Sequence, residues 1–130
     1  MQDRFKFRYV FKKDFGGKTG VCYKMPIFDL NSVTDENFNK VIKGYTDYDY
    51  KLVAIKQATG LKDVNDKLIF EGDILQDKYG CLHPISWNKK GFYEANTFAL
   101  AGFYKAIQED MEVIGNIYET PELLERTNNV

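Results

Sequence analysis

Residues 58–76, Ala-Thr-Gly-Leu-Lys-Asp-Val-Asn-Asp-Lys-Leu-Ile-Phe-Glu-Gly-Asp-Ile-Leu-Gln, form the stretch around which the rest of the chain is organised. Asn and Asp tolerate positive φ and hydrogen-bond their own backbone, so Asn65-Asp66 is predicted to form the apex of a tight turn. The apolar residues on either side of the polar run 62–67 are predicted to be buried. They are Leu61, Leu68, Ile69, Phe70, Ile74 and Leu75.

Two further breaks interrupt this stretch, at 59–60 and at 71–73. We expect Gly72 to take a conformation that other residues avoid, at a bulge or tight corner. A strand over 73–77 is predicted to leave that corner. The whole stretch indicates structure and not chemistry.

The clearest strand lies near the start of the chain, over residues 4–12, where apolar and basic residues alternate. One face carries Phe5, Phe7, Tyr9 and Phe11, and the other carries Arg4, Lys6, Arg8 and Lys12. A second strand over 21–28 is predicted to pair with the first as a hairpin. Pro26 would place it at a sheet edge or a bulge.

Residues 29–44 change to helical spacing. Ser32 or Thr34 could cap a short helix, and Gly44 would end it. A strand over 51–57 is predicted to follow. The segment 29–56 could also be an insertion with a role of its own.

The remaining chain is predicted to be turns and short strands. We expect a turn at 77–80, a strand over 81–87 that Pro84 forces to an edge or bulge, a return at 92–95, and either helix or strand over 97–108. A last strand over 111–118 has Gly115 as a bulge or close-approach point. Thr120-Pro121 is typical of a helix start, giving a helix over 121–126 and a disordered tail over 127–130.

These elements predict one domain of 130 residues that is mainly β. We expect a small barrel or sandwich of antiparallel strands with one or two short helices, because turns recur every 8–12 residues or so. Ten Phe, nine Tyr and one Trp favour strands over helices.

Three segments resemble a known family. Thr-Gly-Leu-Lys-Asp at 59–63 with Glu-Gly-Asp-Ile at 71–74 resembles the signature of the YopX-like family of phage and prophage proteins. Glu-Val-Ile-Gly-Asn-Ile-Tyr-Glu at 112–119, with Pro-Glu-Leu-Leu at 121–124, resembles its C-terminal hallmark, and Lys-Phe-Arg at 6–8 its opening. The chain departs from the family pattern at Tyr9-Val10, which stand for Trp-Asp, and at Asp66, which stands for Gly. The resemblance implies a mostly β fold and a phage origin, and it implies no activity.

Charge and composition limit the function classes. The net charge is −1, so no overall field draws the chain to nucleic acid or to an anionic membrane. No apolar run approaches the ~18 residues of a spanning helix, and basic residues interrupt the N-terminus, so we expect a cytoplasmic protein in the host cell. Cys22 and Cys81 are expected to be free thiols there.

No set of catalytic residues is indicated. Cys81 and His83 would share a face of a strand, as would Asp47 and Asp49, but surface roles explain both pairs. Gly-Lys-Thr at 17–19 lacks the preceding glycine of a phosphate-binding loop. We therefore expect no enzyme, no metal and no cofactor.

Three roles stay open. The first is a non-enzymatic interaction protein that binds a host or phage macromolecule. The second is a nucleic-acid-binding protein that uses the basic stripe of Arg4, Lys6, Arg8 and Lys12, although the same residues can simply protect an edge strand. The third is a self-assembling protein in which edge strands and exposed aromatic residues pair subunits into a homo-oligomer.

Overall fold

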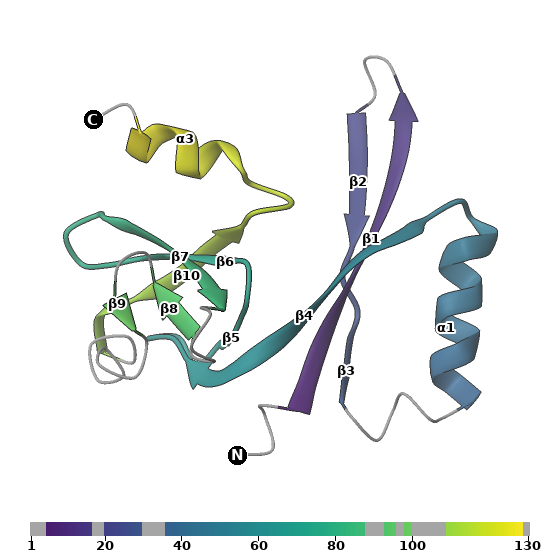
Figure 1. Ribbon diagram of the computed structural model, residues 1–130, viewed down its shortest axis with the longest axis horizontal. Helices are drawn as coiled ribbons and strands as arrows, with labels where there is room; N and C mark the ends of the chain where they lie inside the picture. The colour runs from purple at the N-terminus through teal and green to yellow at the C-terminus, as the bar shows by residue number, and fades with distance from the viewer. Residues whose placement is uncertain are drawn as a thin grey trace. The chain divides into compact units, whose positions relative to one another are not determined.

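The computed structural model describes residues 5–16, 20–29, 36–87, 93–95, 98–99 and 109–128 (Figure 1). The chain divides into two compact units, Met1–Gln57 and Ala58–Val130, which we call unit 1 and unit 2. Both units are built mainly from antiparallel strands, and the described residues include two short helices. The predicted mainly β fold is confirmed.

Unit 1 is a small antiparallel sheet with one helix. It contains β1 (Lys6–Gly16), β2 (Gly20–Lys24), β3 (Ile27–Asp29), α1 (Glu36–Asp47) and the first part of β4 (Lys51–Lys62). The long strand β1 is central, because β2 and β3 pair with one of its edges and β4 pairs with the other. The alternating run near the start of the chain is therefore a strand, as predicted.

Two predictions for unit 1 were wrong in detail. The single strand expected over 21–28 is two strands, β2 and β3, because Pro26 interrupts it, and the Pro26 carbonyl instead accepts a hydrogen bond from the Tyr9 amide at 2.9 Å. Gly44 does not end the helix, which continues to Asp47. The residue with positive φ is instead Asp49, at 67°, in the turn that follows the helix. The proposed caps Ser32 and Thr34 lie outside the described residues.

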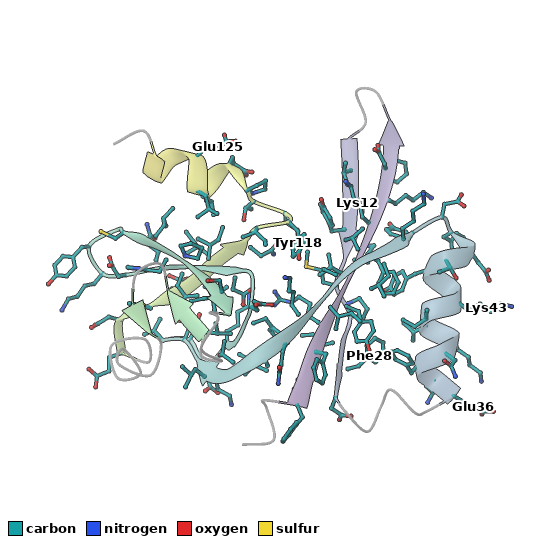
Figure 2. The ribbon with its side chains drawn as sticks, in the orientation of Figure 1. Lys12, Phe28, Glu36, Lys43, Tyr118 and Glu125 are labelled. Atoms are coloured by element: carbon teal, nitrogen blue, oxygen red, sulfur yellow. The ribbon has the colours of Figure 1, made fainter. Side chains whose placement is uncertain are left out.

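Aromatic rings hold α1 against the sheet. The Tyr9, Phe28 and Phe38 rings meet edge to face, with centroids 4.9–5.4 Å apart. Phe11 stacks on Tyr45 of the helix at 4.7 Å. Phe28, labelled in Figure 2, lies between the strands and α1. These pairs add about 0.5–1.5 kcal/mol each to the burial of their apolar area, so Tyr9 and Phe11 of β1 anchor the packing of α1.

Unit 2 is a second antiparallel sheet with a short helix. After the end of β4 come β5 (Leu68–Phe70), β6 (Asp73–Gln76), β7 (Leu82–Trp87), β8 (Tyr93–Ala95), β9 (Phe98–Ala99), β10 (Glu112–Asn116) and α3 (Glu122–Asn128). The sheet order is β10-β6-β7-β8-β9. The helix α3 extends to Asn128, two residues into the segment expected to be disordered.

Pro84 does not lie on an edge strand, contrary to the prediction. It is in β7, between β6 and β8. The sheet tolerates it because β6 pairs with Leu82–Pro84 and β8 pairs with Ile85–Trp87, so Pro84 sits where one ladder gives way to the other.

The core of unit 2 confirms most of the predicted anchors. Ile69, Leu75, Ile85 and Met111 form a buried cluster, with Leu61 and Val113 packed against it. Phe70 and Ile74 are also fully buried, whereas Leu68 is half-buried. The stretch 58–76 thus supplies much of this core, as its apolar pattern indicates.

Candidate functional site

The motif residues of the central stretch prove to be structural, beginning with Asp63. The residue is 4% exposed. Oδ1 accepts hydrogen bonds from the backbone amides of Asn65 and Lys67, each at 2.9 Å, and closes the predicted turn. Oδ2 accepts from the Val113 amide at 2.8 Å. This side chain is therefore occupied in joining the turn to β10.

The corner at Gly72-Asp73 is also structural, because its polar groups make hydrogen bonds to the backbone. Gly72 has φ +94°, as its predicted special conformation requires. Its amide donates to the Ile85 carbonyl and its carbonyl accepts from the Ile117 amide. The buried Asp73 carboxylate accepts from the Phe70 amide at 2.9 Å. The corner therefore joins β5, β7 and the segment that follows β10.

Gly115 is a close-approach point, as predicted. A Cβ there would collide with Oγ1 of Thr120 and lie 3.0 Å from Cδ1 of Leu123. The Thr120 hydroxyl accepts from the Asn116 amide at 2.9 Å and donates to the Asn116 carbonyl at 3.0 Å. Thr120 was expected to cap the following helix, but its side chain bonds backwards to the end of β10.

Asp77, Cys81 and His83 are brought together at the β6–β7 turn. Oδ2 of Asp77 lies 2.9 Å from Nε2 of His83, and Oδ1 accepts from the amides of Tyr79 and Cys81. Burial acts to raise the pKa of Asp77, but the hydrogen bonds from His83, Cys81 and Tyr79 outweigh it, so this pKa is lowered.

This group does not form a nucleophilic pair. Cys81 contacts Asp77 through its backbone amide and not through its thiol. Nδ1 of His83 is buried and has no hydrogen-bond partner. Both cysteines are free thiols. Within the described residues, no three His, Cys, Asp or Glu side chains are arranged to hold a metal ion.

Asp47 and Asp49 do not share the face of a strand. Asp47 is the last residue of α1 and Asp49 lies in the turn that follows. A two-carboxylate site on a strand, which the sequence allowed, is therefore absent at these positions.

Three of the four residues of the basic stripe lie on one face of β1, and Arg4 lies outside the described residues. Arg8 stands opposite Lys56 of β4, and Lys12 stands opposite Lys51. Like charges directly opposite each other destabilise a sheet. The same face carries the fully buried Val10, so the stripe is not a continuous open surface.

The other edge of β4 in unit 1 is exposed. Among the described residues, positions 51–55 of β4 pair with β1 alone. Leu52, Val53 and Ile55 are 44%, 49% and 49% exposed, and we call them the β4 edge surface. Val53 is the extra residue of a bulge, because Val10 pairs with Ala54 and Phe11 with Leu52.

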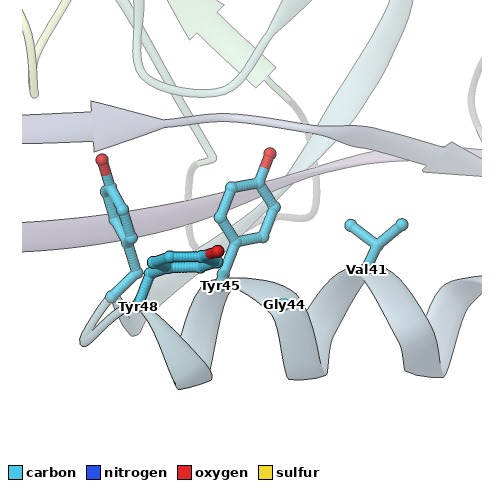
Figure 3. A pocket seen from close by; sticks show the side chains of 5 residues that line it. Val41, Gly44, Tyr45 and Tyr48 are labelled. Carbon is cyan, nitrogen blue, oxygen red and sulfur yellow. The ribbon is translucent and has the colours of Figure 1, made fainter.

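A hollow of about 260 Å³ lies at the end of α1 (Figure 3). Its lining consists of Val41, Gly44, Tyr45, Tyr48 and Tyr50, and we call it the tyrosine hollow. The amides of Tyr48 and Tyr50 both donate to the Tyr45 carbonyl, so the turn after the helix gathers the three rings. The spacing 41, 44, 45 and 48 is that of one helix face, and this was the sequence signal for the hollow.

Gly44 has no structural reason to be glycine. Its φ is not positive, and a Cβ built there meets nothing within 4 Å. Glycine inside a helix costs about 1 kcal/mol relative to alanine. The residue therefore weakens α1, and it lies in the lining of the hollow.

The chain is thus a mainly β protein. The motif residues Asp63, Gly72 and Asp73 stabilise unit 2, and unit 1 exposes the apolar β4 edge surface. Comparison with protein families matches residues 16–125 to the family described as YopX protein, and the chain belongs to that family. The opening Lys-Phe-Arg at 6–8 lies outside the matched residues.

The chain is also similar to a solved structure, protein EF1440 from Enterococcus faecalis. The two share 28% identity over 88% of this chain and 74% of the other, with a TM-score of 0.46. A comparison with curated proteins gives no match. None of the described helices is long and apolar enough to span a bilayer.

Proposed function

We propose that this protein is a phage- or prophage-encoded, non-enzymatic interaction protein that binds a host or phage macromolecule in the cytoplasm of the host cell. The resemblance of its motifs to the YopX-like family supports the phage origin. The observation that carries the interaction role is the β4 edge surface, where three apolar side chains are about half exposed beside a strand edge.

The chemistry of that edge suits an extended partner segment. Unpaired amides and carbonyls at a strand edge can accept another strand, while the side chains on either side give specificity. Lys51 stands at one end of the apolar run, so the partner segment is expected to be apolar with an acidic residue at that end.

The polar groups of unit 2 support a role without catalysis. Asp63, Asp73 and Asp77, which are among the acidic residues of the central stretch and the next turn, accept backbone hydrogen bonds. Their oxygens fix turns and a corner of the sheet and are occupied in doing so.

The test is capture of partners from nuclease-treated host lysate with the tagged chain and two variants. Leu52→Thr/Ile55→Thr makes the edge polar but keeps strand propensity. Val64→Thr is the matched control, because Val64 is 46% exposed and lies in unit 2.

The proposal predicts a defined protein partner that the double variant loses and the control retains. Equal retention by both variants would contradict the use of the β4 edge. A reproducible hydrolase or transferase activity lost on changing Asp47 and Asp49 would contradict the non-enzymatic role.

The alternative is a nucleic-acid-binding protein, and one like-charged pair of β1 and β4 favours it. Sheets rarely gain stability from Lys12 opposite Lys51, whereas an anionic ligand would offset this repulsion. This role predicts affinity for single-stranded nucleic acid that falls steeply with salt. Binding that persists after Lys6→Glu/Arg8→Glu would contradict it.

The same edge would also serve self-assembly, with a second copy as the added strand. That role predicts a mass that rises with concentration in light scattering. A strictly monomeric mass at high concentration counts against it.

A further inference from the structure

We propose that the tyrosine hollow binds an alkylammonium cation, either a free small molecule or a methylated lysine side chain of a partner. The inference goes beyond the interaction role and does not depend on the β4 edge surface. It rests on the lining of the hollow, on the glycine beneath it and on the charge at the end of α1.

The lining has the composition of a cation cage. Tyr45, Tyr48 and Tyr50 surround one hollow, and the Tyr45 and Tyr50 rings are inclined by 73° with centroids 5.7 Å apart. Rings set at steep angles offer π faces from several directions, and a methylated ammonium is attracted to such faces within about 6 Å of a centroid.

One ring of the set already attracts a cation. The Lys13 ammonium lies 5.7 Å from the Tyr50 centroid and 5.1 Å from the Phe15 centroid. Within the described part of the chain, no cation lies over Tyr45 or Tyr48. One face of the Tyr45 ring is stacked on Phe11 at 4.7 Å, so a ligand would meet its other face and the exposed Tyr48 ring.

The end of the helix is electrostatically unfavourable as it stands. The C-terminal end of a helix carries partial negative charge and is stabilised by cations. The last turn of α1 has no basic residue, and Asp47 and Asp49 are both exposed there. Lys43 extends from α1 away from the sheet (Figure 2). A cation in the hollow would offset this negative charge.

Gly44 lies in the lining of the hollow and leaves open space there. The site accepts a Cβ without any contact, yet a glycine stands there at a cost to the helix. A side chain at this position would occupy the space that the ligand needs.

The experiment titrates the full chain with choline chloride at constant ionic strength and follows the backbone amide signals of Gly44 and Tyr48 by NMR. The uncharged isostere 3,3-dimethylbutan-1-ol is titrated in parallel. We expect saturable shifts with choline. The affinity for the alcohol should be lower than that for choline by about tenfold or more.

Two variants test the site itself. Gly44→Leu fills the hollow with a residue that favours helix, so α1 is retained while choline binding is lost. Tyr48→Leu keeps an apolar side chain but removes a π face, and we expect choline binding to weaken about tenfold. Tyr79→Leu is the matched control, because Tyr79 is an exposed tyrosine of unit 2.

A peptide carrying one trimethyl-lysine distinguishes the two sources. Tighter binding of the peptide than of choline assigns the cation to a partner, and equal or weaker binding assigns it to a small molecule. Equal affinity for choline and the alcohol, no saturable shift with choline or the peptide, or unchanged choline binding by Tyr48→Leu would each overturn the proposal.

Discussion

The carboxylate of Asp63 accepts a hydrogen bond from the backbone amide of Val113 at 2.8 Å, across fifty positions of the sequence. The same side chain closes the turn that contains Asn65 and Lys67. Two motifs that resemble one family signature are thereby joined through one buried side chain. The signature specifies how unit 2 is held together.

Replacing Asp63 should therefore destabilise unit 2. Asp63→Ala leaves three backbone amides without their acceptor, and we expect a loss of about 3 kcal/mol in the free energy of unfolding. Urea unfolding followed by the amide signals of Ile69 and Leu75 measures it. Asp66→Asn is the control: its side chain is 84% exposed, and we expect a change below about 0.5 kcal/mol. Equal losses in the two variants would show that the Asp63 bonds are not the cause.

Gly115 should tolerate no side chain. Gly115→Ala brings a Cβ into Thr120 and Leu123, so β10 and the start of α3 must shift. We expect a loss of about 3 kcal/mol in the unfolding free energy of unit 2, measured by urea unfolding. A variant as stable as the original chain would mean that α3 moves away freely.

Gly44 should behave in the opposite way. Gly44→Ala adds a Cβ in open space inside α1, and we expect unit 1 to gain about 1 kcal/mol. Hydrogen exchange of the α1 amides measures the gain as slower exchange. Faster exchange would contradict the finding that no contact requires glycine at this position.

The Asp77–His83 turn should weaken in acid. The folded-state pKa of Asp77 is lowered, so its ionised form adds stability above the unfolded-state pKa, near 3.9 for Asp. That contribution is lost as the pH falls from the unfolded-state pKa through the lower folded-state pKa of Asp77. Thermal unfolding between pH 7 and pH 2 should show a shallower loss of stability for Asp77→Asn. Parallel curves for the two proteins would contradict this role.

Short-range signals in the sequence predicted much of the fold. The alternation in β1, the turn at Asn65-Asp66 and the special conformation of Gly72 each follow from the chemistry of neighbouring residues. The structure has a strand at β1, although Val10 on its basic face is also buried, and it has positive φ at Asp66 in the turn and at Gly72. Gly115 was also predicted as a close-approach point, because a glycine within a strand pattern indicates one.

Features that depend on distant partners could not be predicted. A glycine commonly ends a helix by taking a positive φ. Here Asp49 has the positive φ and Gly44 does not, and this depends on where the chain turns to bring β4 beside β1. Pro84 fits β7 because its two neighbouring strands pair with different halves of it. The β4 edge surface likewise appears only when the pairing of β4 with β1 is known.

The central claim is that unit 1 meets the partner through the β4 edge, and a photo-crosslinker tests it most directly. p-Benzoylphenylalanine would replace Val53 in one variant and Val64 in another, since both side chains are about half exposed. Each variant is irradiated in nuclease-treated host lysate and analysed for adducts by mass. The account predicts a discrete adduct from position 53 and none from position 64. An adduct from position 64 alone would contradict it, as would the absence of an adduct from both positions.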